Sequence, residues 1–218
     1  GDGNSIYWTE EASVYMDYLE SLHKIAKDGT GQLVLLDNVK RITTKPIITD
    51  GEIYLGIMGG YDANGDQIYL LVKLPVAGGS LQTVSSYADY NSNLICGIEA
   101  DATAVYWANR YDVIKISKAD STAVTLAAGV HDPFPYYSGI KGISLNAGNV
   151  FWAEAGNSPG TGNIKSVPKG GGAATSWIID GYMSSVVRSD NDRIYWLEAT
   201  GNLPTVRIAS LTPSTGEI

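Results

Sequence analysis

The stretch Ile6-Tyr7-Trp8-Thr9-Glu10 decides the fold, because the chain repeats it with small changes along its whole length. The later copies are Ile53-Tyr54-Leu55-Gly56, Val105-Tyr106-Trp107-Ala108-Asn109, Val150-Phe151-Trp152-Ala153-Glu154 and Ile194-Tyr195-Trp196-Leu197-Glu198. The anchor aromatics, which are tyrosines except for Phe151, stand 47, 52, 45 and 44 residues apart. A period of this size, carried by β-branched and aromatic residues, predicts an array of small sheets rather than one large core.

Each copy is the second strand of a predicted unit of four. A turn acid or amide such as Asp50, followed by small residues, precedes each anchor and favours a tight hairpin. First strands are expected before these turns, at 46–49, 97–100, 142–145 and 185–188. Third strands, each with a cation beside apolar residues, are expected at 23–25, 72–74, 114–116, 164–166 and 206–208. Fourth strands follow Gly- and Asp-rich turns, at 33–36, 81–84 and 123–126. Antiparallel units of four strands are the blades of an all-β propeller.

These motifs resemble the YWTD repeat of low-density-lipoprotein-receptor-type β-propellers (the class B repeat), and similar repeats in bacterial propellers. The resemblance rests on Ile-Tyr-Trp-Thr-Glu, the Lys-Ile strand and Lys-Asp-Gly-Thr-Gly at 27–31, and it covers essentially the whole chain. The departures are that Thr9 is the only threonine at its position and that the family's aspartate is replaced by Glu10, Asn109, Glu154 and Glu198. In the family this aspartate ties blades together, so the resemblance implies architecture and not receptor function.

The repeats predict five blades in a single propeller domain over 1–218. No segment before the first anchor can supply the first strand of the first blade. The given sequence also stops where the fourth strand of the fifth blade is expected. A ring with open sheet edges needs its ends joined. The alternatives are therefore a fragment, an unusual ring closure, or six blades with one supplied by chain outside this sequence.

Strand polarity sorts the connections between strands onto two faces. The short turns fall on one face, and the connections at 11–22, 57–67, 87–93, 128–139, 155–162 and 180–184 fall on the other, where we expect irregular loops rich in tyrosine. Loops on a rigid scaffold commonly carry recognition, and tyrosine beside carboxylates suits a protein or a glycan ligand. The predicted ligand-binding residues are Tyr15, Tyr18, Tyr61, Tyr87, Tyr90, Tyr136, Tyr137, Tyr182, His131 and Asp132. The competing interpretation is that these tyrosines only pack the loops onto the blades.

Catalytic and metal motifs are few. His131 beside Asp132 suits a general base, so the alternative function is a propeller lyase or glycosidase with its site at the axial mouth. A structural module of a longer repeat protein is the third hypothesis. The oxygen ligands of Asp62-Ala63-Asn64-Gly65-Asp66 suit calcium, but Lys73 occupies the twelfth position, where a glutamate is needed, so a plain glycine turn is favoured and no cofactor is expected. The cations of the third strands are expected to cover the outer strands with their charge in water.

The composition excludes some partners and compartment signals. With a net charge of −8, the chain lacks the clustered cations that nucleic-acid binding requires. No apolar run reaches membrane-spanning length, and residues 1–4 have no signal-peptide character. The chain is therefore either intracellular or separated from a targeting segment, and the composition does not decide between the two. The binding hypothesis takes the second alternative, an exported bacterial protein (periplasmic, cell-surface or secreted) whose signal segment lies outside this sequence. The single Cys96, in an apolar run, is expected to be a buried small side chain.

Overall fold

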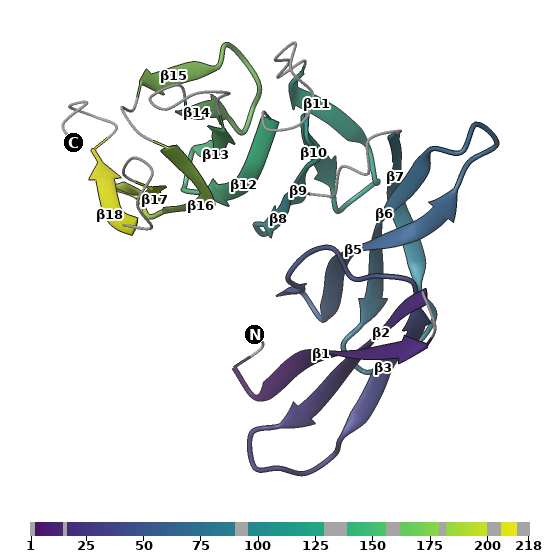
Figure 1. Cartoon of the computed structure of the whole chain (residues 1–218). Coiled ribbons are helices and arrows are strands. Elements are labelled where there is room, and N and C mark those ends of the chain that lie inside the picture. Colours follow the sequence, from purple (N-terminus) through teal and green to yellow (C-terminus); the bar gives the residue numbers. More distant parts are fainter. Residues whose placement is uncertain are drawn as a thin grey trace. The chain divides into compact units, whose positions relative to one another are not determined.

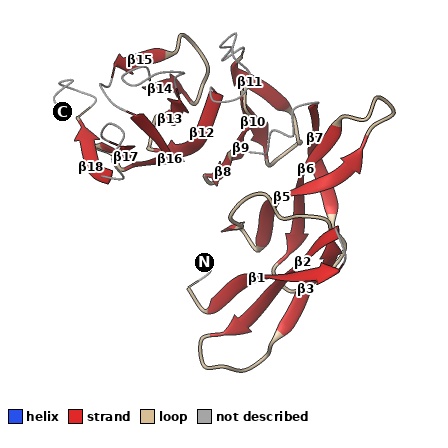
Figure 2. Ribbon diagram, in the orientation of Figure 1, coloured by secondary structure: helices blue, strands red, loops and turns tan. Residues whose placement is uncertain are grey.

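The computed structural model describes residues 3–14, 17–89, 96–128, 139–155, 162–178, 182–199 and 206–212. Within these ranges every regular element is a β-strand (Figure 2). The chain forms two compact units, Gly1–Ala102 and Thr103–Ile218. The prediction of an all-β fold is therefore confirmed.

The first unit contains two sheets with consecutive strand order (Figure 1). The three-stranded sheet consists of β1 (Ser5–Val14), β2 (Asp17–Ala26) and β3 (Leu33–Val39). The four-stranded sheet consists of β4 (Ile47–Thr49), β5 (Glu52–Tyr61), β6 (Gln67–Pro75) and β7 (Gln82–Asp89). All pairings in these two sheets are antiparallel.

The remaining strands form three further sheets, also in consecutive order. One sheet joins β8 (Gly97–Ala100) with β9 (Ala104–Ala108), β10 (Val113–Ser117) and β11 (Ala123–Ala127). The next consists of β12 (Gly139–Leu145), β13 (Asn149–Ala155), β14 (Asn163–Pro168) and β15 (Thr175–Ile178). The last consists of β16 (Tyr182–Ser189), β17 (Ile194–Ala199) and β18 (Val206–Leu211). Every strand predicted from the repeats is found. Within the described residues, β1 has no neighbour on its inner side.

The hairpin turns before the anchor strands have the chemistry that the sequence predicts. Asp50 and Gly51 both adopt positive φ, 52° and 77°, which is the signature of a tight turn between twisted strands. Where the turn has no positive-φ pair, an Asx side chain caps it: Asn146 Oδ1 accepts hydrogen bonds from the backbone N–H groups of Gly148 and Asn149 at 3.0 and 2.8 Å. These local bonds fix where each sheet reverses direction.

The connections after the anchor strands differ from the prediction. Residues 11–22 and 57–67 were expected to be irregular loops, but β1 continues to Val14 and β5 to Tyr61, and each pairs with its successor almost to the tip. Two of the proposed loop insertions are therefore long β-hairpins, and the same correction applies to 87–89, which lie in β7. The reason is that residues such as Ile57, Ile68 and Tyr69 extend the strand-forming pattern beyond the repeat motif.

Apolar side chains from neighbouring sheets form the core inside each unit. In the first unit, Leu22 and Leu35 pack with Ile53, Leu55, Ile57, Val72 and Leu74 of the next sheet. In the second unit, Phe151, Ala153 and Ile164 pack with Val187, Ile194 and Trp196 of the next sheet. Full burial of one such large side chain contributes about 1.5–3 kcal/mol. Packing of one sheet on the next within a unit is what the repeat pattern predicts of blades.

The third-strand cations are not equivalent in register. Lys24, Lys73 and Lys115 each lie across from an anchor tyrosine. Lys165 instead lies across from Trp152, and Arg207 lies across from Glu198. The sequence pattern alone did not show this shift, because it aligns cations by their neighbours and not by their cross-strand partners.

Two of these lysines also correct the expectation that their charge lies in water. Lys24 Nζ donates a hydrogen bond to the carbonyl oxygen of Val76 at 3.0 Å, and Lys115 Nζ donates one to the carbonyl oxygen of Lys169 at 2.9 Å. In both pairs the acceptor lies in the turn after the third strand of the following sheet. The ammonium groups therefore link consecutive sheets, since a charged donor on a carbonyl is stronger than a neutral one.

Candidate functional site

Most of the predicted ligand-binding residues lie outside the described residues. This group comprises Tyr15, Tyr90, His131, Asp132, Tyr136 and Tyr137. For Tyr18 and Tyr182 the structure gives the backbone only: it places them in β2 and β16, and not in loops as predicted. Tyr61 and Tyr87 are the predicted residues whose side chains are described.

Tyr61 and Tyr87 belong to one polar and aromatic cluster at the β5–β6 hairpin. Tyr61 is 59% exposed, and Lys40 Nζ lies 5.7 Å from the centre of its ring. Gln67 Nε2 donates to the Tyr61 hydroxyl at 3.3 Å, and the Tyr69 hydroxyl donates to Gln67 Oε1. Tyr69 pairs across the strands with the half-buried Tyr87. The structure thus brings the two predicted tyrosines into one neighbourhood, with Tyr61 as its exposed ring.

The turn between β5 and β6 uses its carboxylate as a cap. Asp62 Oδ1 accepts hydrogen bonds from the backbone N–H groups of Asn64 and Asp66 at 2.8 and 2.9 Å. These donors, that of Asp66 first, hold the pKa of the Asp62 carboxyl below its usual value. Within the described ranges, no three His, Cys, Asp or Glu side chains come together as a metal site would require.

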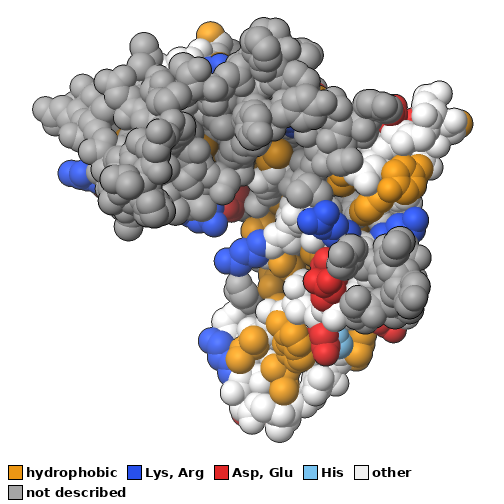
Figure 3. Space-filling view, in the orientation of Figure 1, with side chains coloured by type: hydrophobic (Ala, Val, Ile, Leu, Met, Phe, Trp, Pro, Cys, Tyr) orange, Lys and Arg blue, Asp and Glu red, His pale blue; other side chains and the backbone are white. Residues whose placement is uncertain are grey.

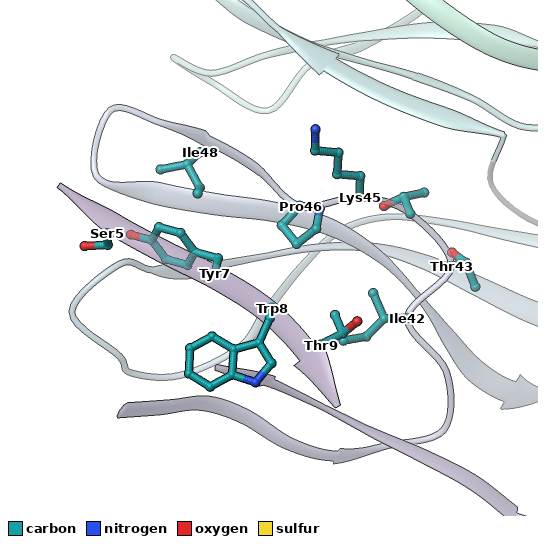
Figure 4. Close-up of a pocket in the computed structure, with 10 residues that line it drawn as sticks. Ser5, Tyr7, Trp8, Thr9, Ile42, Thr43, Lys45, Pro46 and Ile48 are labelled. Atoms are coloured by element: carbon teal, nitrogen blue, oxygen red, sulfur yellow. The ribbon is translucent and has the colours of Figure 1, made fainter. Parts of the chain in front are cut away.

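A cavity in the first unit was not predicted. It has a volume of about 630 Å³, within the range of small-molecule sites. One wall is β1, through Ser5, Tyr7, Trp8 and Thr9, and the other is the segment before and into β4, through Ile42, Thr43, Thr44, Lys45, Pro46 and Ile48 (Figure 4). Because side chains alternate along a strand, Tyr7 and Trp8 point to opposite sides of β1, as Figure 4 shows.

The facing segment is held in place by bonds to β5. Ile42 forms a β-bridge with Ile57, and the Thr43 backbone N–H donates to the Gly56 carbonyl oxygen at 2.8 Å. The Thr44 hydroxyl accepts a hydrogen bond from the Gly56 backbone N–H at 2.8 Å. Thr43 Oγ1, in contrast, is buried and has no hydrogen-bond partner among the described residues. The wall is therefore joined to β5 by backbone and side-chain hydrogen bonds, and it carries the Thr43 hydroxyl oxygen as a buried polar atom without a partner among the described residues.

Trp8 differs from the tryptophans of the other repeats. Trp107, Trp152 and Trp196 are each 1% exposed, whereas Trp8 is only partly buried. One side of its ring stacks on His23, with ring centres 5.1 Å apart and planes 14° from parallel. His23 Nε2 lies 3.3 Å from Glu10 Oε2, a distance at which an ion pair forms when the imidazole is protonated. The stack fixes the Trp8 ring and leaves the residue as part of the cavity wall.

The position of β1 in its sheet explains this difference. In the described part of the chain β1 is an edge strand, whereas β5, β9, β13 and β17 each have an inner neighbour. The residue across from Trp152 on that neighbour is Ile143, and the residue across from Trp196 is Val187. Both are almost fully buried, at 2% and 0% exposure. Among the described residues, no inner-strand side chain lies across from Trp8 as Ile143 and Val187 lie across from these two tryptophans.

The lining of the cavity is aromatic, aliphatic and hydroxylic, with a single charge. Four of the ten lining residues are serine or threonine, namely Ser5, Thr9, Thr43 and Thr44. Lys45 is the one charged residue of the lining. Neither a carboxylate nor a histidine lines the cavity. Figure 3 shows hydrophobic side chains gathered on the surface where Figure 1 draws β1, with acidic side chains nearby.

Comparisons with known proteins identify the fold. Neither a known protein-family profile nor a curated protein matches the chain. Among solved structures, puromycin hydrolase superposes with a TM-score of 0.68 at 12% identity over 99% of this chain, and one from a study of two prolyl endopeptidases with 0.65 at 12% identity over 99%. The putative TolB from Agrobacterium tumefaciens superposes with 0.60 at 10% identity over 91%. The chain has a propeller-type fold.

The propeller spans different shares of these proteins. It covers 35% of the puromycin hydrolase chain, 33% of the prolyl endopeptidase chain and 74% of the putative TolB chain. Identities of 10–12% indicate a shared fold alone. In the part of this propeller that the structure describes, no helix has the length and apolarity needed to cross a bilayer.

Proposed function

We propose that this propeller is a non-enzymatic scaffold that binds a protein or a glycan through aromatic surfaces, the cavity beside β1 first among them. The observation that carries the proposal is the partly buried Trp8, which lines a cavity of about 630 Å³ while its counterparts in three other repeats are 1% exposed. The finer features expected from the sequence, five blades built from YWTD-like repeats and export from the cell, belong to the same proposal.

The lining supports binding rather than catalysis. A glycosidase needs a pair of carboxylic acids at the scissile bond, and a lyase needs a general base. The cavity offers hydroxyl groups, two aromatic rings and one ammonium group, but no carboxylate or imidazole. Aromatic rings with hydroxyl groups and a single charge are typical of recognition sites, in which apolar contact gives affinity and a few polar groups give orientation. Binding of this kind needs neither a metal nor another cofactor.

The test is a binding screen with two matched variants. A panel of immobilised glycans and a displayed library of extended peptides are probed with the parent protein, with Trp8→Ala and with Tyr61→Ala. Tyr61 is the matched control, because it is an exposed aromatic residue of the same unit that does not line the cavity. We expect ligands that the parent and Tyr61→Ala bind and that Trp8→Ala does not.

The outcomes separate the two surfaces. Loss of binding in Tyr61→Ala with retention in Trp8→Ala would move the site to the cluster at the β5–β6 hairpin, which contains two of the ten ligand-binding residues predicted from the sequence, Tyr61 and Tyr87. Full retention in both variants, with circular dichroism confirming that they are folded, would refute the proposal.

A second candidate function is a structural module of a longer protein. It is favoured by the coverage of only 33–35% of two longer chains, one of which is named as a hydrolase and the other as a prolyl endopeptidase. Light scattering of the purified chain tests it: concentration-dependent association through sheet edges is expected of an excised module, and a monomer at all concentrations counts against it.

A further inference from the structure

One dipeptide at the tip of the β5–β6 hairpin has a chemistry that the proposed binding function does not use. Asn64–Gly65 is the one place in the sequence where a glycine directly follows an asparagine. Both residues are exposed. The side-chain amide of an asparagine can react with the backbone nitrogen of the next residue, and a side chain on that residue hinders the approach. Glycine has no such side chain, so the hindrance is least at this bond.

The surroundings of Gly65 leave this reaction open. Among the described residues, no atom beyond those of its chain neighbours lies within 4 Å of the position that a β-carbon would take. The Gly65 N–H donates to the Asp62 carbonyl oxygen at 3.2 Å, which is at the long end of the hydrogen-bond range, whereas the Asp62 N–H donates to the Asp66 carbonyl oxygen at 2.9 Å. The nitrogen that has to react is therefore exposed and weakly held.

We propose that Asn64 is a site of spontaneous deamidation and isoaspartate formation, and that this modification releases Tyr61 from its contacts. The inference goes beyond the proposed function and does not depend on it. It needs water as its co-reactant and neither an enzyme nor a metal.

The reaction balances as a hydrolysis of the side-chain amide. The Gly65 nitrogen loses its proton to hydroxide and forms a bond to Asn64 Cγ. The Cγ–Nδ2 bond breaks, the leaving nitrogen takes a proton from water, and ammonia departs from a cyclic succinimide. Water then opens the ring at one of its two carbonyl carbons, which gives aspartate or isoaspartate. In sum, one water is consumed and one ammonia is released.

Other asparagines of the described chain provide internal controls. Asn38 is exposed like Asn64 and has a positive φ of 55°, but the β-branched Val39 follows it. Asn109 is 1% exposed, and its Oδ1 accepts hydrogen bonds from two backbone N–H groups at 2.7 and 2.6 Å. An arginine follows it in the sequence. Neither residue combines exposure with an unhindered neighbouring nitrogen, so both should react much more slowly.

The products disturb the turn because Asn64 is bonded to Asp62. Asp62 Oδ1 accepts the Asn64 backbone N–H at 2.8 Å, and Asp62 Oδ2 accepts from Asn64 Nδ2 at 3.4 Å. Deamidation replaces the Nδ2 donor with a second carboxylate, so this contact becomes repulsive. Isoaspartate also adds a methylene to the backbone before Gly65, which changes the loop length that fixes the hairpin register. Tyr61 belongs to the last cross-strand pair before the turn, so it is the first residue of β5 to be released.

The test is peptide mapping of the full chain by mass spectrometry during incubation at neutral and at mildly alkaline pH. We expect the peptide that contains residues 62–66 to gain one mass unit with time, faster at the higher pH, and fragmentation to show isoaspartate at position 64. The peptides with Asn38 and Asn109 should change at least about tenfold more slowly. Asn64→Gln keeps an amide but moves it one methylene further along the side chain, so this variant should stay unmodified.

The release of Tyr61 has a separate readout. Lys40 Nζ lies 5.7 Å from the centre of the Tyr61 ring, so nuclear Overhauser effects between the two side chains report their contact. We expect these signals to weaken in the parent as the modified fraction grows and to persist in Asn64→Gln over the same time.

The outcomes decide both parts of the inference. Deamidation at Asn64 that is no faster than at Asn38, or a rate that does not rise with pH, would overturn the assignment of the site. Complete modification with unchanged contacts between Tyr61 and Lys40 would overturn the proposed release. If Asn64→Gln does not fold, the time course of the parent against its own Asn38 and Asn109 peptides still decides. None of these measurements involves a ligand, so the result is independent of the binding screen.

Discussion

The side chains of Trp152, Glu154 and Lys165 are joined by a hydrogen bond and an ion pair, which provide the sharpest test of how a propeller sheet is held together. Trp152 Nε1 donates to Glu154 Oε1 at 2.7 Å, and Lys165 Nζ lies 2.8 Å from Glu154 Oε2. The Glu154 and Lys165 side chains are 11% and 27% exposed. Replacement of Lys165 by Met keeps the aliphatic stem but leaves a largely buried carboxylate without its counter-charge. Breaking a fully buried pair in this way costs about 3–5 kcal/mol, so partial exposure of the lysine reduces the expected loss to about 2–3 kcal/mol.

The assay is urea and thermal unfolding followed by tryptophan fluorescence. For a chain of this size the loss corresponds to a fall in Tm of about 4–12 °C. Glu154→Gln is the control background, because glutamine still accepts the Trp152 N–H and carries no charge that needs Lys165. We expect Lys165→Met to cost about 1 kcal/mol or less in that background. An equal cost in both backgrounds would show that the ammonium–carboxylate contact does not stabilise the sheet, and the reasoning would be refuted.

Three further outcomes are expected. Lys115→Met removes the hydrogen bond to the Lys169 carbonyl and should lower the free energy of unfolding by about 1–2 kcal/mol in urea denaturation; an unchanged midpoint would contradict the proposed link between sheets. The backbone N–H groups of Asp192 and Arg193 lower the pKa of the Asp190 carboxyl, so the stabilising contribution of this residue is present above the unfolded-state pKa of about 3.9 and is lost as the pH falls through the lower folded-state value. The stability difference between the parent and Asp190→Ala should therefore shrink on acidification, and a difference that grows would be contrary. Gly51→Ala should cost about 1 kcal/mol in thermal unfolding, since φ is 77° although no atom lies within 4 Å of the added methyl group, and no loss would show that the turn relaxes.

Much of the fold could be predicted because its signals are local. The aromatic anchors, the Asp-Gly and Asx turns and the alternating strands depend on residues within one hairpin, and these elements lie where the pattern indicated. The inner strands at 97–100 and 142–145 lie where they were expected, the first with both bounds correct. Cys96 shows the limit of a composition argument, since it is half-buried and not buried as expected.

The rest depends on pairings that are distant in sequence. Whether a repeated tryptophan is covered depends on the inner neighbour of its strand, so Trp8 and Trp152 look alike in sequence and differ in exposure. The hairpin residues up to Tyr61 looked like loop residues because they fall outside the repeat, yet cross-strand pairing continues through them. Of the ten predicted ligand-binding residues, Tyr61 is the one whose side chain is described and exposed. None of the ten lines the cavity beside β1.

The lysine links between sheets have a consequence for how such repeats diverge. Their acceptors are main-chain carbonyl oxygens, and the residues that carry them, Val76 and Lys169, have nothing in common chemically. Mutation at an acceptor position therefore leaves the link intact, whereas the donor has to stay a long cation. Only the lysine donor of each link is therefore constrained in residue type. The turns that supply the carbonyl acceptors can differ in sequence from one sheet to the next while the hydrogen bond between the sheets is kept.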